Sequence, residues 1–317
     1  MNPHSSSLFH FTKKKKTFKS IIENGLRYSF AYESFPEAIV NNIFCHGLFP
    51  MIDSCATNKE MGYAIPMISF CDIPLTRVES HSKRYGKYAI GISKDYLCQI
   101  YSEFINPVLY ADSTSVTAAF KQLTRSQGIA IKSLSLLSQC RKEFNLDDLL
   151  RQRSEGDVSM EAIINQFPQD IKELYDFAVE ADMSVKTLIS LLKPTYGTNV
   201  DGEYQCFYDE HEWRAIYPDL HDSAFEWQII HNRAEYKSYQ ERLNEALNGE
   251  DNAFIDIPGR SFNCISHIIV PKEKDIPYIT NIIANNDKLL GYTNIGNYQR
   301  LHLISKVTSF ERIQNDY

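Results

Sequence analysis

The peptide YDEHEWRAI places Glu210, Glu212 and Arg214 at alternate positions of a segment that we interpret as a β-strand. Alternate side chains of a strand share a face, so these three are expected to lie together, with His211 and Trp213 on the other face. Two adjacent carboxylates repel each other, and the pKa of one of them should rise, which suits general acid–base chemistry. The alternative is an edge strand with a solvated charged face, on which Arg214 simply pairs with Glu212.

A histidine and a threonine occupy a second predicted strand, LFHFT (8–12). Alternation puts Phe9 and Phe11 on one face and His10 and Thr12 on the other. The place of His10 upstream of the glutamate strand favours a functional role, whereas a lone histidine in an apolar strand is more often a core residue. Both interpretations of His10 stay open at this point.

A third group lies in SFCDIP, which follows an apolar run and contains Ser69, Cys71 and Asp72. Cys71 could act as a nucleophile if a base lay beside it. The sequence shows neither a fixed cation nor a helix N-terminus that would lower the pKa of this thiol. A buried structural cysteine is therefore the alternative.

Two groups of basic residues could contact phosphates, although each could equally be a solvated face. The chain of 317 residues has a net charge of −7, so any contact with nucleic acid would have to come from such local groups. The first group is the lysine run 13–16, followed by Lys19 and Arg27. The second flanks the SFCDIP segment and consists of Arg77, Lys83, Arg84 and Lys87.

Several classes of protein lose support from what the sequence lacks. No P-loop, Rossmann or zincin sequence occurs, and the seven cysteines include no C-x-x-C pair, so neither a disulfide framework nor a metal site is expected. The N-terminal sequence MNPHSSSLFHFTKKKK has no apolar stretch typical of a signal peptide, and no apolar run approaches the roughly 18 residues that span a bilayer. We therefore expect a cytoplasmic protein without membrane contacts.

Hydrophobic spacing predicts an α+β fold with strands at both ends of the chain and helices between them. Phe18, Ile21 and Ile22 have helical spacing, and Gly25 should end that helix. Further strands are predicted at 64–74, 87–93, 106–110, 204–217, 265–270 and 300–307, and further helices at about 223–247 and 276–285.

Strand signals disappear between about 115 and 193, where apolar residues recur at spacings of three and four. Pro168 suits the first turn of one helix in this block, and Pro194 should end a last helix around 185–193. We therefore predict a division into 1–114 and 196–317, which form the two halves of one core, and a helical insertion at 115–195.

Taken in order, the segments LFHFT, MISFCDIPL, YGKYAIGIS, NPVLY, YDEHEWRAIYP and ISHIIVPKE resemble the AbiGi-type abortive-phage-resistance family. The most specific pieces are EHEWR and SFCDIPL. The same order is similar to the ADP-ribosyltransferase superfamily, including DarT-like enzymes that modify nucleic acids. This second resemblance implies an ADP-ribosyltransferase-like fold of split antiparallel sheets around the helical insertion, with NAD+ as the substrate.

The resemblance to ADP-ribosyltransferases also implies roles for individual residues. His10 and Thr12 would hold the adenosine ribose, Ser69 would lie near the nicotinamide, and Glu210 and Glu212 would be catalytic. A first-strand histidine and a late E-x-E usually mark different branches of that superfamily, so the chain combines two signatures. The aromatic residue that stacks on the nicotinamide stays open among Tyr28, Phe70, Tyr85 and Tyr88.

Cleavage of the nicotinamide–ribose bond passes through an oxocarbenium-like state, which Glu212 would stabilise while Glu210 holds or deprotonates the acceptor. The expected function is mono-ADP-ribosyl transfer from NAD+ to a macromolecule, more readily nucleic acid than protein, in a phage-defence or toxin–antitoxin system. The alternative, from the AbiGi-type resemblance, is a non-catalytic antitoxin or regulatory protein that binds a partner toxin. Nuclease or glycosidase use of the glutamates would need a metal cluster or a second carboxylate strand, and the sequence indicates neither.

Overall fold

The computed structural model describes residues 5–34, 62–100, 105–111, 169–198, 204–217, 228–230, 233–249, 253–255 and 262–316. The chain divides into two compact units. Unit 1 comprises Met1–Glu33, Gly62–Tyr110 and Lys193–Tyr317, and unit 2 comprises Ser34–Met61 and Ala111–Leu192. The boundaries that we predicted at 114 and 195, and the roles of those segments, stay predictions.

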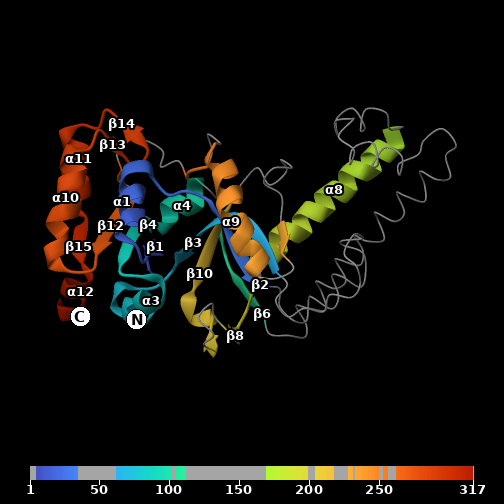
Figure 1. Ribbon diagram of the computed structural model, residues 1–317, viewed down its shortest axis with the longest axis horizontal. Coiled ribbons are helices and arrows are strands. Elements are labelled where there is room, and N and C mark those ends of the chain that lie inside the picture. The colour runs from blue at the N-terminus through green and yellow to red at the C-terminus, as the bar shows by residue number, and fades with distance from the viewer. Residues whose placement is uncertain are drawn as a thin grey trace. The chain divides into compact units, whose positions relative to one another are not determined.

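The main sheet has nine strands, in the order β15-β12-β4-β1-β3-β10-β5 with β2 and β11 also paired to β3 (Figure 1). Neighbours along this order are antiparallel except β12 and β15, which are parallel. The fold is therefore α+β with a mixed sheet, and the ADP-ribosyltransferase-like arrangement stays a prediction. The strands are β1 (Ser7–Thr12), β2 (Ser29–Ser34), β3 (Gly62–Cys71), β4 (Tyr88–Ser93), β5 (Ile105–Pro107), β10 (Glu212–Ile216), β11 (Gln228–Ile230), β12 (Ile265–Val270) and β15 (Val307–Ser309).

The remaining elements are helices, short strands and single turns of 3-10 helix. No helix in the described ranges is long and apolar enough to cross a membrane. The α-helices are α1 (Lys15–Asn24), α3 (Val78–Tyr85), α4 (Lys94–Ile100), α8 (Gln169–Ser190), α9 (Arg233–Asn248), α10 (Ile276–Asn285), α11 (Asn297–Ser305) and α12 (Phe310–Asp316). The short strands are β6 (Leu109–Ala111), β7 (Leu192–Pro194), β8 (Tyr196–Thr198), β9 (Tyr204–Cys206), β13 (Lys288–Leu289) and β14 (Tyr292–Thr293), and the 3-10 turns are η1 (Leu75–Arg77), η2 (Tyr208–Glu210) and η3 (Glu273–Asp275).

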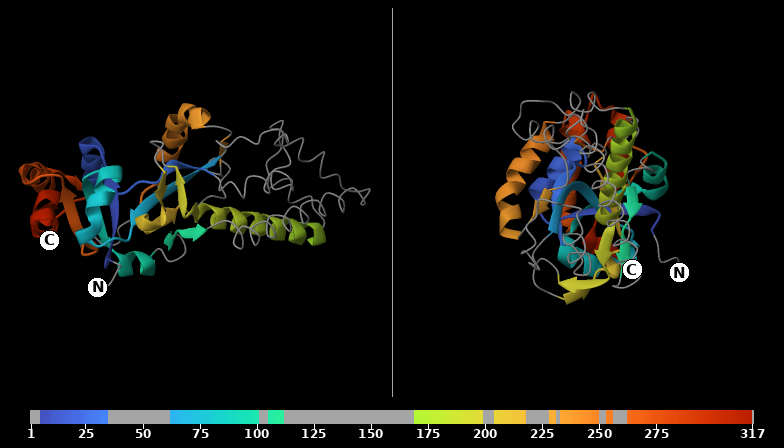
Figure 2. Two further views of the ribbon diagram at one scale, coloured as in Figure 1. Left: turned by 90° about the horizontal axis from the view of Figure 1, so that it is seen from below. Right: turned by 90° about the vertical axis from the view of Figure 1, so that its right-hand side faces the viewer.

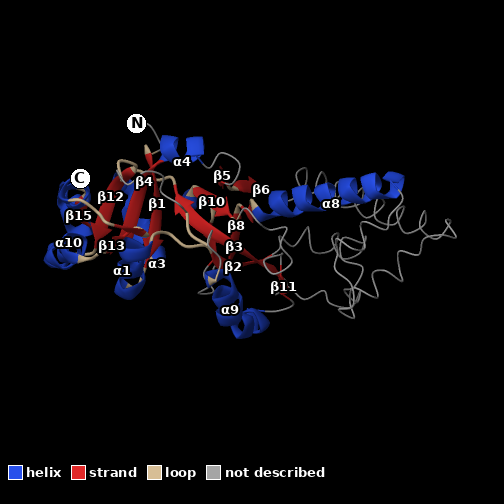
Figure 3. Cartoon of the chain, turned by 90° about the horizontal axis from the view of Figure 1, so that it is seen from above, coloured by secondary structure: helices blue, strands red, loops and turns tan. Residues whose placement is uncertain are grey.

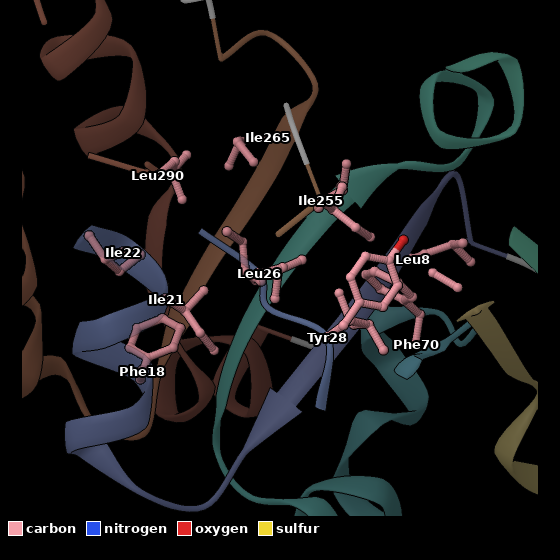
Figure 4. Close-up of a cluster of buried hydrophobic side chains, with 14 of the residues drawn as sticks. Leu8, Phe18, Ile21, Ile22, Leu26, Tyr28, Phe70, Ile255, Ile265 and Leu290 are labelled. Carbon is pink, nitrogen blue, oxygen red and sulfur yellow. The ribbon is translucent and has the colours of Figure 1, made fainter. Parts of the chain in front are cut away.

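Alternate side chains of β1 enter two different layers of the core, as the sequence predicts. Leu8 packs in the larger cluster with the apolar face of α1 (Figure 4). Phe9 lies in a smaller cluster with Val78 of α3 and Phe310 of α12, and Phe11 packs against that cluster. Helices α1 and α9 both contribute to the larger cluster and lie on the same side of the sheet (Figures 2 and 3).

The first predicted helix is confirmed in both its buried face and its end. Phe18, Ile21 and Ile22 are buried, which is the spacing of one helical face. Gly25 follows the last residue of α1 with φ of 90°, and its N–H donates to the carbonyl of Ile21 at 2.8 Å. A positive φ favours glycine, so this residue stops the helix for the reason expected.

The strand that we predicted at 300–307 is wrong, because most of that segment belongs to helix α11 and only β15 follows it. The alternation that suggested a strand does not describe what is buried: Leu303 is buried, whereas Leu301 is 66% exposed. The guanidinium of Arg300 donates to the carbonyl of Ile283 at 2.7 Å, near the end of α10. This contact ties α11 to the preceding helix and satisfies a carbonyl of its last turn.

Other predicted elements exist with different bounds. The helix expected at 185–193 is the end of the longer α8, and β7 follows it. The strand expected at 204–217 is interrupted by η2, and the strand at 106–110 consists of β5 and β6. The helix near 223–247 is α9, which begins at Arg233 after β11. The rest of the predicted helical block, residues 115–168, lies outside the described residues.

The turn between α3 and β4 depends on Gly86, so we expect Gly86→Ala to lower the free energy of unfolding by roughly 2–3 kcal/mol. Gly86 has φ of 109°, and a Cβ there would lie 2.2 Å from the carbonyl oxygen of Thr12 and 2.5 Å from the nitrogen of Lys13. Gly249→Ala is the control, because its Cβ meets only the carbonyl oxygen of Ala246 at 3.5 Å. Urea unfolding measures both variants, and equal stabilities would contradict this account of the turn.

Candidate functional site

Glu212 and Arg214 form a buried ion pair in the interior of the main sheet. Strand β10 lies between β3 and β5, with Glu212 opposite Cys71 and Arg214 opposite Ser69. The Nε of Arg214 lies 2.9 Å from Oε1 of Glu212, and a terminal nitrogen of Arg214 lies 3.1 Å from Oε2 of Glu33. Arg214 is 0% exposed and Glu212 is 7% exposed. The pairing that we considered is therefore present, but on a central strand rather than at a solvated edge.

Lys193 joins the two glutamates, and the sequence analysis did not identify it. Its Nζ lies 2.7 Å from Oε2 of Glu210 and 2.8 Å from Oε2 of Glu212. Glu210 is part of the turn η2, and His211 follows with φ of 43°. The two carboxylates therefore meet around one ammonium group, whereas the continuous strand that we predicted through both residues does not exist.

Neighbouring cations, rather than repulsion between the two carboxylates, dominate the electrostatics of Glu212. Burial alone would raise the pKa of Glu212, but the charges of Arg214 and Lys193 outweigh it and hold this pKa well below its usual range. Burial opposes the charge on Lys193 as well, yet the carboxylates of Glu212, Glu33 and Glu210 hold the pKa of Lys193 well above its usual value. Both partners of this buried pair are therefore charged at neutral pH.

Hydroxyl and amide groups complete the contacts of the two carboxylates. The hydroxyl of Ser69 donates to Oε1 of Glu212 at 2.9 Å. Oε1 of Glu210 accepts from the hydroxyl of Tyr85 and, at 3.1 Å, from the amide of Gln205. Each of the four carboxylate oxygens thus has at least one donor. We call Glu210, Glu212, Lys193 and Arg214, together with Ser69 and Tyr85, the charged cluster.

His10 lies near this cluster but on the opposite face of the sheet. Phe9 and Glu212 both lie opposite Cys71 in their respective pairings, so these three side chains share a face and His10 points to the other. The Nδ1 of His10 is 2.9 Å from the main-chain carbonyl of Ser69. Burial lowers the pKa of His10, against the effect of that hydrogen bond. Side chains 69 and 212 therefore meet, whereas His10 reaches only the backbone of this site.

The other residues that the resemblance singled out are dispersed. Thr12 lies opposite Tyr88 at the end of β1, and the ring of Tyr88 packs on Phe18 with centroids 5.1 Å apart. Tyr28 is buried against Tyr217, with centroids 5.4 Å apart. Phe70 is buried beside His10. Among the four aromatic candidates, Tyr85 contacts a glutamate of the charged cluster, and the roles of all four stay predictions.

Cys71 has a potential base beside it, but the pair is not activated. Its Sγ is 2.6 Å from Nε2 of His81 on α3. Burial and the charges of Glu212 and Glu210 raise the pKa of the Cys71 thiol, and burial lowers the pKa of His81 to about 4. A neutral thiol beside a neutral imidazole is a structural contact rather than a nucleophile. Asp72 is also structural, because Lys94 lies 2.6 Å from its carboxylate.

Within the parts of the chain that the structure describes, no three histidine, cysteine, aspartate or glutamate side chains are arranged to hold a metal ion. The charged cluster contains two carboxyl groups, one ammonium, one guanidinium and two hydroxyls. This set can hold a cation or an electron-deficient sugar carbon only if Lys193 moves away, because Lys193 lies between the carboxylates.

Comparison with known proteins identifies the family to which the chain belongs. Residues 54–257, which include β3, Lys193 and both glutamates, match the family model "Putative abortive phage resistance protein AbiGi, antitoxin". The chain belongs to the AbiGi family of abortive phage resistance proteins.

A particular relative supports the same assignment. The abortive phage resistance protein AbiGi of Lactococcus lactis subsp. cremoris is 24% identical over 271 residues, which cover 80% of this chain and 89% of that protein. No solved structure matches the chain. The resemblance to the AbiGi-type family is thus confirmed, and the resemblance to ADP-ribosyltransferases stays a prediction.

Removing the shared ammonium by Lys193→Met should lower the free energy of unfolding by about 3–5 kcal/mol at pH 7, because two carboxylates lose their common partner in a buried site. Lys193→Met/Glu210→Gln should recover part of this loss, since Glu210 has lost its ammonium partner whereas Glu212 keeps Arg214. Lys237→Met is the control at an exposed position of α9. Denaturant unfolding measures all three variants.

The same variants have a predicted pH dependence. The low pKa of Glu212 means that its contribution to stability is complete above the ordinary carboxyl value of 4.5 and is lost as the pH falls below it. The difference between wild type and Lys193→Met should therefore shrink below that pH. A difference that stays constant down to acidic pH would show that Glu212 does not depend on Lys193 for its charge.

Proposed function

We propose that this chain acts as the antitoxin of an abortive-infection system and restrains a partner toxin by binding it. The observation that carries the proposal is the combination of a family described as antitoxin with a charged cluster that is closed on itself. Both oxygens of Glu212 already interact with cations, and the side chain is 7% exposed. A carboxylate held in this way supports the fold and is poorly placed to meet a substrate.

Binding a toxin requires a surface that the charged cluster does not supply, and the hairpin β8–β9 offers one. Tyr196 and Tyr204 stack with centroids 6.4 Å apart and are 52% and 76% exposed. Tyr208, in the following turn, is 52% exposed. Tyrosine is enriched in protein interfaces because it supplies a large contact area with few rotatable bonds. We call these three residues the tyrosine face and assign it to the toxin.

If the tyrosine face binds the toxin, Tyr204→Ser should weaken the complex about tenfold or more, the usual effect at an interface hot spot. Tyr298→Ser is the matched control, because Tyr298 is 74% exposed on α11. Growth rescue in cells that express the candidate toxin from the same locus, with titration of the purified proteins, measures the effect. Equal rescue and equal affinity for both variants would remove the tyrosine face from the proposal.

A second candidate, ADP-ribosyl transfer from NAD+, is favoured by one contact. The hydroxyl of Ser69 on β3 donates to Glu212 on β10, which brings together the serine and the glutamate that the resemblance implicates. Catalysis would further require Lys193 to leave Glu212, so that the carboxylate could face the developing charge on the ribose. The acceptor would be nucleic acid or protein, and Glu210 would hold it.

Incubation of the protein with labelled NAD+ and separate pools of protein, DNA and RNA distinguishes the two candidates. A transferase should label one pool, and Glu212→Gln should reduce that labelling by about 10²–10³-fold. An antitoxin without catalysis should label none and consume no NAD+, while Glu212→Gln, if it folds, should still neutralise the toxin. Melting curves of Glu212→Gln separate loss of activity from loss of fold.

A further inference from the structure

Three neighbouring strands, β1, β4 and β12, begin or end level with one another. Their ends form one rim of the main sheet, which we call an edge here. Strand β1 ends at Thr12, which lies opposite Tyr88, the first residue of β4. Strand β12 is antiparallel to β4, with Ile269 opposite Ala89, so its last residue, Val270, lies at the same edge. The chain therefore leaves β1, enters β4 and leaves β12 at adjacent positions, although these positions are far apart in the sequence.

Each of these three positions is occupied by exposed lysines, and we call their surface the basic edge. Some lysines lie between β1 and α1 or begin α1. Others lie at the end of α3 or between α3 and β4, and one follows β12. The residues of the basic edge are Lys13, Lys14, Lys15, Lys83, Lys87 and Lys272, all of them exposed. Members of the two basic groups that were separate in the sequence are thus brought together and joined by Lys272.

Specific contacts support this arrangement. The backbone of Gly86, next to Lys87, packs so closely on Thr12 and Lys13 that a Cβ would come within 2.5 Å of the nitrogen of Lys13. The Nζ of Lys15 lies 3.6 Å from the centre of the ring of Tyr278 on α10. Tyr278 is 38% exposed, so the basic edge includes a partly exposed aromatic ring.

Two acidic residues near the basic edge, Glu273 and Asp275, have interactions of their own. Glu273 is paired with Arg312 at 2.9 Å, and its N–H donates to Glu311. Asp275 is half-buried and lies near Tyr88. Burial is the main cause that raises the pKa of Tyr88, and the charge of Asp275 raises it further. The basic edge gathers six exposed lysines in a chain whose net charge is −7. Gathered lysines repel one another, and a polyanion relieves that repulsion.

We propose that the basic edge binds single-stranded nucleic acid through its phosphodiester backbone. Lysines release counterions from phosphates without reading sequence, and an adjacent aromatic ring can stack on an unpaired base. Tyr278 makes a single strand the better partner, since the bases of a duplex are already stacked. The proposal uses residues outside the charged cluster and the tyrosine face, so it does not depend on either candidate function.

Fluorescence anisotropy with labelled 20-nucleotide single strands of mixed sequence, at several salt concentrations, tests the proposal. Binding should weaken with salt, and Lys13→Gln/Lys87→Gln should reduce the slope of log K against log salt by about 1.4, because two phosphate contacts are lost. Tyr278→Ala should weaken binding roughly tenfold. The control Lys237→Gln/Arg242→Gln makes the same change in charge at exposed positions of α9 and should bind like the wild type.

Other outcomes overturn the proposal. Equal weakening by the control pair would mean that net charge, not the basic edge, governs binding. Tighter binding of a duplex of the same sequence would contradict the stacking of Tyr278 on an unpaired base. Binding to vesicles of phosphatidylglycerol but not to oligonucleotides, lost in Lys13→Gln/Lys87→Gln, would assign the edge to an anionic lipid surface. Toxin neutralisation, measured in the same variants, should be unchanged in every case.

Discussion

The burial of Arg214 is the constraint on which the site depends. A guanidinium with no exposed surface is stable only when carboxylates surround it, and Glu212 and Glu33 do so. Glu212 in turn shares Lys193 with Glu210. These residues come from separate segments of unit 1: Glu33 lies in β2, Lys193 in β7 and Arg214 in β10. One set of charges therefore fixes how these three strands meet. The low pKa of Glu212 is the electrostatic sign of the same constraint.

This arrangement bears differently on the two candidate functions. A binding protein gains from a saturated cluster, because its surfaces are then held on a rigid sheet. A transferase gains only if Lys193 can leave Glu212, so that the positive charge of the substrate takes the place of its ammonium. The location of Lys193 is compatible with either role: it lies in β7, at the residue where the chain passes from unit 2 back into unit 1. The family description favours the binding protein.

Local features of the fold were predictable, whereas partners distant in sequence were not. Helix α1 and strand β1 follow from one clear period each, and Gly25 marks the helix end. The alternation around Leu301 and Leu303 is short enough to fit a strand or a helix, and only the contact of Arg300 with α10 decides between them. The sequence offers no reason to select Lys193, because its role comes from its contacts with Glu210 and Glu212. These two residues follow it in the chain only after the direction of the chain has changed. The left-handed backbone of His211 was also hidden, since that conformation is uncommon for any residue but glycine.

The discontinuous make-up of unit 1 has a consequence for how the protein is made. Strands β1, β3 and β4 leave the ribosome early. Their pairing partners come late, because β10, which pairs with β3, and β12, which pairs with β4, both lie in the last third of the chain. Until that part is translated, buried apolar strands have open hydrogen-bonding edges, which are sites of aggregation. The nascent chain would therefore depend on chaperones, and premature termination before β10 would yield an insoluble fragment rather than a smaller folded protein.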